Sequence, residues 1–574
     1  WWLAREPASE AARVTPLSAP AAPRAATPPP PVRFTDVTGA GGIHFRHVNG
    51  ARGEKFLPET MGGGVACLDF DSDGDIDLFF VNSMEWPGAA APGPAAVGAL
   101  YRNDTPAGSA MRFTDVTAGS GLDVPMYGMG AAAGDYDNDG RVDLLVTAVG
   151  GPRLFHNLGG GRFREVTREA GLGGLETEWS TAAAWFDLEN DGDLDLFVGN
   201  YVRWTPEIDR EVNNVLVGVG RAYGRPWNYP GTMPRLFRNE GGGRFADVSA
   251  RSGLQLRNPA TGVPLAKTLA VAPIDLNEDG WMDLVVANDT VRNLVFTNRH
   301  DGTFAEVGVE SGIAYDAYGQ ARGAMGIDAA RFRNDDTLGI AIGNFANEMN
   351  ALYVSQGPRE RLEFADAAIA EGLGPSSQLL LKFGLFFFDY DLDGRLDVLT
   401  VNGHIEEEIG KVQTAVRYRQ PAQLFWNAGT GQTFVNVGPE VAGPDLFMPR
   451  VGRGSAYADL DGDGDLDVVM TQVNGPAAVM RNNLDRPTGW IRIRLAGTRS
   501  NRDAIGAWIY ARKGGQTIAR QVMPTRSYLS QSELPVTLGW GGGTLESLEV
   551  RWPDGRRQSV DIPADGTRLV VQER

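Results

Sequence analysis

The sequence is short of cysteine, of cationic side chains and of long apolar runs, and each shortage excludes a class of protein. Its one cysteine, Cys67, excludes an intramolecular disulfide framework and any cysteine-rich zinc site. Beyond the N-terminal end, no stretch approaches the roughly 18 uninterrupted apolar residues that a transmembrane helix requires. Asp and Glu number 72 against 53 Lys and Arg, which gives a net charge of −19. Because binding to phosphate groups needs clustered Lys and Arg, we expect no nucleic-acid partner.

The first 31 residues show neither helical nor strand periodicity. Residues 7–31 are rich in Ala and Pro and end in four consecutive prolines, a composition that predicts an extended, semi-rigid linker. Trp1, Trp2 and Leu3 are typical of the trailing edge of an apolar signal or membrane anchor, and an arbitrary chain boundary is the alternative. We expect a linker over residues 1–31, with an N-terminal membrane tether as one alternative and no transmembrane span in the chain.

Three phrases recur along the rest of the chain, each of them seven times. The first is an Asp-rich loop followed by an apolar strand, as in DFDSDGDIDLFFVN from Asp69. The second is a short apolar strand that usually ends in Asn, as in LYRN from Leu100. The third is an aromatic strand followed by a Gly-containing turn, as in RFTDVTGAGG from Arg33. The order within a unit is always Asp loop, short strand and aromatic strand.

This repeat predicts an all-β fold, a seven-bladed β-propeller. Together with the Ala/Gly-rich run before each Asp loop, a unit offers four short β-segments, as a propeller blade requires. The chain begins with an aromatic strand over residues 33–38, and the seventh unit lacks one after Asn482. We therefore expect the first strand to complete the seventh blade and close the ring, which removes exposed sheet edges. The propeller is expected over residues 32–486 and a small C-terminal β-domain over residues 487–574.

The Asp-rich loops predict calcium sites. Their pattern D-x-D-x-D-G-x-x-D supplies side-chain oxygens at positions 1, 3, 5 and 9, and a hard cation such as Ca²⁺ takes six to eight oxygen ligands. Gly at position 6 permits the sharp turn that the loop needs. The residues that follow favour a strand, so we expect a β-loop-β unit and not a helix-loop-helix unit. The proposed ligands of the six intact loops are Asp69, Asp71, Asp73 and Asp77; Asp135, Asp137, Asp139 and Asp143; Asp187, Glu189, Asp191 and Asp195; Asp275, Asn277, Asp279 and Asp283; Asp389, Asp391, Asp393 and Asp397; and Asp459, Asp461, Asp463 and Asp467.

Ordinary Asp-Gly hairpin turns are the alternative interpretation of these loops. Six copies at the same place in a repeat argue against it, because four carboxylates in one loop repel one another without a cation. The fifth copy is damaged: counted from Asp328, it has Ala330 at position 3 and Phe332 at position 5. We expect about six Ca²⁺ sites and no metal in the fifth blade.

The C-terminal region differs from the rest in charge. Residues 488–574 alternate apolar and polar positions, as in WIRIRLAG from Trp490, which predicts an antiparallel β-domain. They contain 13 Lys and Arg against 8 Asp and Glu, in a chain that is otherwise acidic. The basic tail is expected to pack on the propeller or to bind an acidic ligand such as a glycan; a solvated sheet face is the alternative.

The Asp-rich loops resemble integrin-type FG-GAP repeats, also called VCBS repeats. The phrases KFLPETMGGGVACLDFDSDGDIDL from Lys55 and TVNGHI from Thr400 resemble the cartilage acidic protein family and its bacterial relatives. The tail phrases NRDAIGAWI from Asn501 and VRWPDG from Val550 resemble the ASPIC/UnbV domain that ends those proteins. The resemblance implies a bacterial member that is a secreted, periplasmic or cell-surface calcium-binding propeller. The loop of the fifth blade departs from the pattern.

No enzymatic motif accompanies these features: the chain has no G-x-S-x-G, H-E-x-x-H, P-loop or dinucleotide fingerprint. A metalloenzyme with a His/Glu transition-metal site near the propeller axis is conceivable if His44 or His47 meets His404 and its neighbouring Glu residues. Strand alternation turns His44 and His47 to opposite faces, which weakens that alternative. The favoured hypothesis is a binding or adhesion module with structural calcium and a protein or glycan partner. A structural subunit of an envelope complex is a further alternative. The insertion over residues 201–234, rich in Trp, Tyr and Arg, is either its recognition surface or a packed lid.

Overall fold

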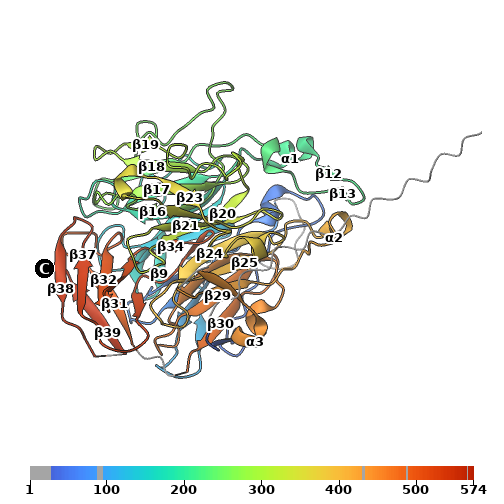
Figure 1. Ribbon diagram of the computed structural model, residues 1–574. Coiled ribbons are helices and arrows are strands. Elements are labelled where there is room, and N and C mark those ends of the chain that lie inside the picture. The colour runs from blue at the N-terminus through green and yellow to red at the C-terminus, as the bar shows by residue number, and fades with distance from the viewer. Residues whose placement is uncertain (1–27, 87–94, 430–432, 486–488, 565) are drawn as a thin grey trace, which may run out of the picture.

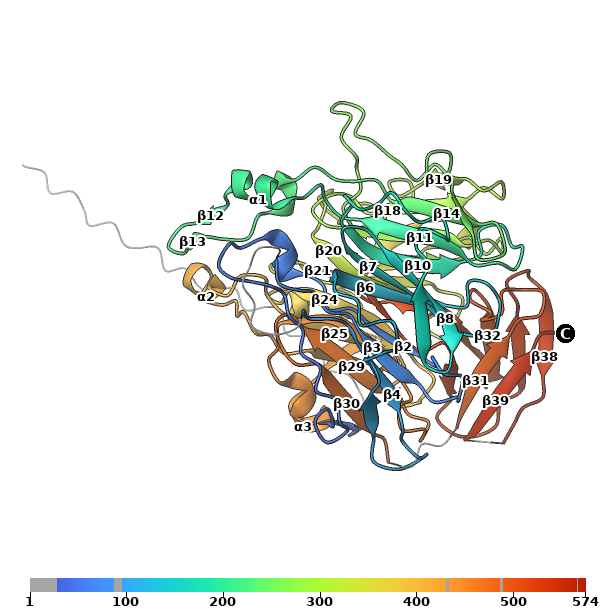
Figure 2. The same ribbon diagram turned by 180° about the vertical axis from the view of Figure 1, so that it is seen from behind.

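The protein is a ring of seven β-sheets with a small β-domain on one side (Figures 1 and 2). The computed structural model describes residues 28–86, 95–429, 433–485, 489–564 and 566–574; the expected linker up to residue 27 lies outside them. In each sheet, the strand nearest the axis is followed outwards by its neighbours in chain order. The innermost strands contact one another in cyclic order, from β2 through β6, β10, β16, β20, β24 and β28 back to β2. This closed order is that of a β-propeller.

The blades are numbered from the first complete sheet. From the axis outwards, their strands are β2 (Val65–Leu68), β3 (Asp77–Phe80), β4 (Ala99–Asn103) and β5 (Phe113–Asp115) in blade 1; β6 (Tyr127–Gly134), β7 (Asp143–Val149), β8 (Arg153–Gly159) and β9 (Arg162–Glu165) in blade 2; β10 (Ser180–Phe186), β11 (Asp195–Asn200), β14 (Arg235–Asn239) and β15 (Phe245–Asp247) in blade 3; β16 (Thr268–Ile274), β17 (Asp283–Asn288), β18 (Leu294–Asn298) and β19 (Phe304–Glu306) in blade 4; β20 (Ala324–Ala330), β21 (Gly339–Asn344), β22 (Ala351–Ser355) and β23 (Phe364–Asp366) in blade 5; β24 (Lys382–Phe388), β25 (Asp397–Asn402), β26 (Gln423–Asn427) and β27 (Phe434–Val437) in blade 6; and β28 (Gly452–Ala458), β29 (Asp467–Gln472), β30 (Ala478–Asn483) and β1 (Arg33–Asp36) in blade 7.

The first strand closes the ring, as the order of the repeats predicts. Strand β1 pairs antiparallel with β30, from Arg33 opposite Asn483 to Asp36 opposite Met480. The last blade therefore contains both ends of the propeller sequence. This closure removes the two exposed sheet edges that an open array of blades would have.

Glycines let the innermost strands of blades 1 and 2 approach Leu529 closely. Strand β6, with the sequence YGMGAAAG, is buried along its whole length. A Cβ added at Gly130 would lie 2.9 Å from the Cβ of Leu529, and one added at Gly64 would clash with the Leu529 carbonyl. Inner strands with larger side chains could not approach the axis this closely.

One position near the end of the third strand ties six of the blades to the blade before each of them. In six blades the residue at this position is Asn. Its side-chain amide donates to the carbonyl of the second residue in the loop that joins the first and second strands of the preceding blade. The bonds run from Asn103 to Leu460, Asn157 to Phe70, Asn239 to Tyr136, Asn298 to Leu188, Asn427 to Phe332 and Asn482 to Tyr390, at 2.8–2.9 Å. Blade 5 ends its third strand with Ser355 instead.

The C-terminal domain contains two sheets and a segment that enters the propeller. One sheet consists of β36 (Val536–Gly539), β31 (Trp490–Ala496) and β39 (Thr567–Gln572), and the other of β33 (Gln516–Gln521), β32 (Trp508–Lys513), β37 (Ser547–Arg551) and β38 (Arg557–Val560). Strands β34 (Thr525–Arg526) and β35 (Ser530–Gln531) instead join the sheet of blade 1, where Gln531 pairs parallel with Ala66. We call residues 524–533 the plug segment, because they contact the innermost strands of all seven blades around the axis.

Helices are few and lie at the margins of the propeller. The helices are α1 (Pro206–Val212), α2 (Ile409–Val412) and α3 (Pro439–Ala442), with 3₁₀ turns at Leu57–Thr60, Pro226–Asn228, Arg359–Arg361, Pro375–Ser377 and Asp445–Phe447. Helix α1 begins where the Thr205 hydroxyl accepts the Ile208 N–H, with Pro206 as its first residue. It is followed by the hairpin β12 (Val215–Leu216) and β13 (Gly220–Arg221), on the side of the propeller away from the C-terminal domain (Figures 1 and 2). None of the helices in the described residues has the length and apolar character to cross a bilayer.

Candidate metal centres

The six intact Asp-rich loops share one local structure. Each connects the first and second strands of a blade, so that in blade 1 Asp69 follows β2 and Asp77 begins β3. The residue at position 4 has a positive φ in all six, as at Ser72. In five loops the N–H of the sixth-position Gly donates to the first carboxylate, for example Gly74 to Asp69 at 3.2 Å. The expected β-loop-β geometry is therefore present.

The ninth-position carboxylate has a structural role that the sequence pattern does not reveal. In blade 1, Asp77 accepts the N–H of Phe70 at 3.1 Å and the N–H of Asn103 at 2.7 Å. Asp77 thus fastens the loop to the third strand, whose Asn side chain reaches the preceding blade. All six intact loops have the bond to the third strand.

Carboxylate oxygens converge in four of the six loops. In each of these, one oxygen from each of three side chains lies within 4.8 Å of the other two. The trios are Asp69, Asp71 and Asp77; Asp135, Asp137 and Asp143; Asp389, Asp391 and Asp397; and Asp459, Asp461 and Asp463. Within the described residues, the loops of blades 3 and 4 bring together no such trio of acidic side chains, and in blade 4 the third position is Asn277.

Every intact loop also buries at least one side-chain oxygen that has no hydrogen-bond partner. These atoms include Oδ1 of Asp71, Oδ1 of Asp137, Oε2 of Glu189, Oδ1 of Asp275, Oδ1 of Asp389 and Oδ1 of Asp459. A buried carboxylate oxygen without a partner costs free energy, so a group that satisfies it stabilises the fold. An oxygen-rich, anionic loop fits a hard divalent cation in this respect.

Burial also makes these carboxylates hard to ionise in the absence of a cation. It raises the pKa of Asp77 to about 8 and that of Asp187 to about 7. Burial and the neighbouring charge of Asp393 raise the pKa of Asp391 to about 7. A bound divalent cation would favour the ionised forms and remove this cost.

The damaged loop of blade 5 lies three residues further along the chain than the sequence indicates. Ala330 pairs with Gly339 where the intact loops pair the end of the first strand with the ninth-position Asp. Asn334 has the positive φ of position 4, so position 1 is Arg331 and position 3 is Arg333. Asp328 instead lies inside β20; the strand continues past this apparent first loop residue, so the count from Asp328 was wrong.

Arg331 places a positive charge at the first position of the blade 5 loop, where the intact loops have a carboxylate. Its guanidinium contacts Glu278 and lies 3.1 Å from Asp336. A positive side chain at the first position repels a cation, which is in keeping with the expectation that this loop binds no metal.

The C-terminal domain packs its basic side on the acidic loops, one of the two expected uses of its charge. In five blades an Arg of this domain approaches the first carboxylate of the loop. The pairs are Arg494 and Asp69 at 3.4 Å, Arg502 and Asp135 at 4.0 Å, Arg551 and Asp275 at 3.0 Å, Arg520 and Asp389 at 3.4 Å, and Arg492 and Asp459 at 3.6 Å. At blade 5, where position 1 is Arg331, the domain presents the rings of Trp508 and Tyr510 to that guanidinium, at 5.1 and 5.5 Å.

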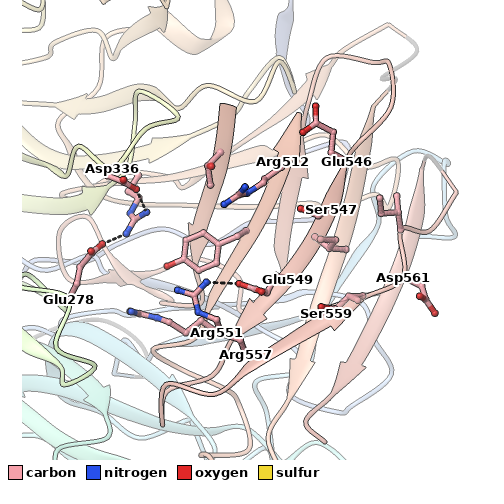
Figure 3. Close-up of a pocket in the computed structure, with 16 residues that line it drawn as sticks. Glu278, Asp336, Arg512, Glu546, Ser547, Glu549, Arg551, Arg557, Ser559 and Asp561 are labelled. Carbon is pink, nitrogen blue, oxygen red and sulfur yellow. Dashed lines mark hydrogen bonds and ion pairs between the residues drawn. The ribbon is translucent and has the colours of Figure 1, made fainter. Parts of the chain in front are cut away.

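A groove that the sequence does not predict runs along this interface. It has a volume of about 740 Å³ and lies between the outer sheet of the C-terminal domain and the loops of blades 4 and 5. Figure 3 shows Glu278 and Asp336 on the propeller side, facing Arg512, Glu549 and Arg557 on the sheet. Glu549 and Arg557 form an ion pair at 2.8 Å. The groove is polar and contains both signs of charge.

The histidines of the metalloenzyme alternative do not assemble a metal site. His44 is exposed and His47 is buried, so they lie on opposite faces as expected. Burial, with the nearby Arg453 guanidinium, lowers the pKa of His47 to about 3, and burial lowers that of His404 to about 4. Nδ1 of His404 accepts the N–H of Glu406 at 3.0 Å. In the described part of the chain, neither His47 nor His404 joins a group of three close ligand atoms.

The insertion over residues 201–234 is packed on the rest of the protein at some positions and exposed at others. Tyr201, Tyr223 and Tyr229 are buried, and Tyr201 donates to Asp289 at 2.5 Å. Trp227 is 61% exposed, with the Arg225 guanidinium 5.2 Å from its ring. Three tyrosines of the insertion are thus packed as a lid would be, while one tryptophan is exposed.

Residues 497–574 match the family described as ASPIC and UnbV, and residues 69–146, 135–198, 275–342 and 389–470 match the FG-GAP-like repeat. The protein is therefore an FG-GAP repeat propeller with a C-terminal ASPIC/UnbV domain. It is a homologue of cartilage acidic protein 1. Its identity to that protein is 25% over 555 residues in Homo sapiens, covering 90% of this chain and 72% of the relative. In Xenopus tropicalis it is 25% over 524 residues, covering 87% and 71%.

Two solved structures with a similar fold are distant from this chain. An Agrocybe aegerita lectin that recognises non-reducing terminal N-acetylglucosamine shares 15% identity at a TM-score of 0.38, over 72% of this chain and 87% of the lectin chain. The Dos1 propeller shares 12% identity at a TM-score of 0.36, over 74% and 94%. These likenesses are too distant to carry an argument about a ligand.

Proposed function

We propose that this protein is a calcium-stabilised binding module that works outside the cytoplasm, as a secreted, periplasmic or cell-surface protein. The observation that carries the proposal is that each of the six intact loops buries at least one side-chain oxygen without a hydrogen-bond partner. Six independent loops with the same unmet need are better explained by a common ligand than by six turns. Oxygen donors and a net negative loop favour Ca²⁺ among the common cations.

The role of the ions in this proposal is structural. Calcium would neutralise the loop carboxylates and hold the first and second strands of each blade together. The first carboxylate of five loops also faces an Arg of the C-terminal domain, as with Asp389 and Arg520 at 3.4 Å. An ordered loop therefore presents a fixed anionic surface to the basic domain, and metal binding supports domain docking.

The binding role rests on the FG-GAP propeller and on the cartilage acidic protein relatives. A protein or a glycan is the proposed partner. Weak extracellular calcium modules have dissociation constants of roughly 10⁻⁴–10⁻³ M, which suits a compartment rich in calcium. The polar groove of Figure 3, with side chains of both charges, is the first surface to examine for that partner.

Calorimetric titration tests the metal part of the proposal. The full chain, freed of metal by a chelator and then dialysed, is titrated with Ca²⁺ and separately with Mg²⁺. The proposal expects several equivalents of Ca²⁺, up to six, and weaker binding of Mg²⁺, because Mg²⁺ demands near-ideal octahedral geometry. Binding of no Ca²⁺ by a folded protein overturns it.

A further inference from the structure

Blade 2 differs from the other blades in the residue that faces its Asp-rich loop. His156 lies on β8, one residue before Asn157. Its Nδ1 is 3.2 Å from an oxygen of Asp143 and 3.5 Å from an oxygen of Asp137. The equivalent residue is an Arg, a Thr or a Trp in the other blades with intact loops, namely Arg102, Arg238, Thr297, Trp426 and Arg481. An imidazole among carboxylates is thus particular to blade 2.

The ninth-position carboxylate is also arranged differently in this blade. In the other five intact loops one of its oxygens accepts the N–H of the second loop residue. The corresponding oxygen of Asp143, Oδ2, is buried without a hydrogen-bond partner, and the residue is 0% exposed. Oδ1 of Asp137 is buried without a partner as well. Two buried carboxylate oxygens near the imidazole are therefore free of hydrogen bonds and able to bind a cation.

Two groups of close ligand atoms overlap here. Asp135, Asp137 and Asp143 form one trio within 4.8 Å, and Asp137, Asp139 and His156 form another. Within the described residues this is the one such group that includes a histidine. Imidazole nitrogen suits zinc, copper, iron and nickel, whereas Ca²⁺ takes oxygen ligands.

We propose that the blade 2 loop binds a divalent first-row transition ion, with His156 as its nitrogen ligand and Asp137 and Asp143 among its oxygen ligands. The inference builds on the proposed function, because it treats the Asp-rich loops as cation sites, but it assigns a different metal class to one of them. In blades 1, 3 and 7 the equivalent side chain is Arg, a permanent cation that cannot supply a nitrogen ligand to a metal ion.

The rival interpretation gives His156 a supporting role only. In blade 6 the Trp426 Nε1–H donates to Asp391 at 2.8 Å, a bond to the third loop position that leaves no nitrogen for a metal. His156 could orient Asp137 in the same way beside a calcium ion. The two interpretations differ in whether an imidazole nitrogen is bonded to the ion.

The experiment uses the full chain saturated with Ca²⁺. Zn²⁺ is added in the continued presence of excess Ca²⁺, unbound metal is removed by dialysis, and bound zinc is counted. The inference expects one equivalent of Zn²⁺. His156→Arg places in blade 2 the residue that blades 1, 3 and 7 already contain, so it is compatible with the fold, and we expect it to weaken Zn²⁺ binding by more than about tenfold.

His300→Asn is the matched control. Nε2 of His300 lies 2.9 Å from Asp279 in blade 4, but the imidazole is 45% exposed and joins no trio of ligand atoms in the described residues. This variant is expected to keep the zinc equivalent. Loss of zinc in His300→Asn but not in His156→Arg overturns the assignment.

A spectroscopic measurement on the unmodified protein keeps the inference testable whatever the variants do. Mn²⁺ is loaded at one equivalent in excess Ca²⁺, and pulsed electron paramagnetic resonance detects coupling to a directly bonded imidazole nitrogen. The inference expects that coupling in the unmodified protein and its loss in His156→Arg. Absence of nitrogen coupling, or absence of a zinc equivalent, overturns it, while calcium titration of the same sample reports independently on the proposed function.

Discussion

Arg526 of the plug segment forms an ion pair with Asp328 of blade 5, at 2.6 Å between Nη1 and Oδ1, and both side chains are buried. The same guanidinium donates to the Met523 carbonyl at 2.9 Å. Asp328 accepts the N–H of Phe387 from blade 6 with its other oxygen, at 2.8 Å. The C-terminal domain is thus attached at the propeller axis as well as at the loops.

Replacing Arg526 with Gln should destabilise the protein strongly. It would leave the Asp328 carboxylate buried without its counter-charge, a loss of about 3–5 kcal/mol for a broken buried pair. Denaturant unfolding of the full chain measures this free energy. Arg502→Gln is the control, because the Arg502 side chain is 55% exposed and lies 4.0 Å from Asp135; a change below about 1 kcal/mol is expected there. Equal effects of the two variants would contradict the account of the plug segment.

Asp391→Asn should remove one calcium equivalent from blade 6. The substitution keeps the size of the side chain but takes away the charge of a proposed ligand that belongs to a close trio. Calorimetric titration counts the remaining sites. Asp335→Asn in the blade 5 loop is the matched control, since Arg331 and Arg333 occupy the first and third positions there; the count should not change. A lower count in Asp335→Asn would mean that blade 5 does bind metal.

Asn157→Ala should loosen the contact between blades 1 and 2. Its amide donates to the Phe70 carbonyl at 2.8 Å and to the Val142 carbonyl at 2.9 Å, and the residue is 0% exposed. Leaving these carbonyls unsatisfied costs about 1–3 kcal/mol. The measurement is denaturant unfolding, with the exposed Asn483→Ala as the comparison. An unchanged free energy of unfolding in Asn157→Ala would remove the inter-blade role of these asparagines.

The buried Glu59, on the face of the propeller away from the C-terminal domain, should make the free energy of unfolding depend on pH. Burial raises its pKa to about 7, with the charge of Asp209 adding to the effect and the Trp86 N–H, 3.0 Å away, opposing it. The folded protein therefore holds a proton that the unfolded chain releases near its ordinary pKa of about 4.3. Its contribution favours the folded state at low pH and is lost as pH rises through about 7.

Glu59→Gln should remove that dependence, because the amide stays neutral. At saturating calcium, its free energy of unfolding should exceed that of the unmodified protein by about 1 kcal/mol near pH 5 and by roughly 3–4 kcal/mol near pH 8. The exposed Glu169→Gln serves as the comparison and should show no such divergence. Parallel pH profiles for Glu59→Gln and the unmodified protein would show that Glu59 is ionised in the fold.

Local sequence patterns predict the propeller, its closure and the loops, because each depends on residues that are close together in the chain. Asp69 to Asp77 form one loop. The seventh unit lacks an aromatic strand, and the extra aromatic strand before the first unit, β1, supplies it. Hydrogen bonds between segments that are far apart in the chain could not be predicted from the sequence. The Asn at the end of each third strand was visible as a pattern, but its acceptor lies in the preceding blade, as with Asn157 and Phe70.

One wrong prediction and one omission have identifiable causes. Asp328 looked like the first loop residue because it is an Asp in the right neighbourhood, whereas strand pairing with Gly339 sets the loop three residues later. The sequence signal for His156 is the phrase LFHN, because the equivalent phrases of the other blades with intact loops have Arg, Thr or Trp in place of the His. The plug segment shows no strand alternation, since its conformation depends on contacts with the innermost strands of the propeller.

Thermal unfolding of the full chain at increasing free Ca²⁺ tests the central claim most directly. A ligand that binds only the folded state stabilises it by an amount that grows with the logarithm of its concentration. The account predicts that the unfolding temperature rises steadily with free Ca²⁺ above the dissociation constant and falls on chelation. An unfolding temperature that is the same in chelator and in millimolar Ca²⁺ would contradict it.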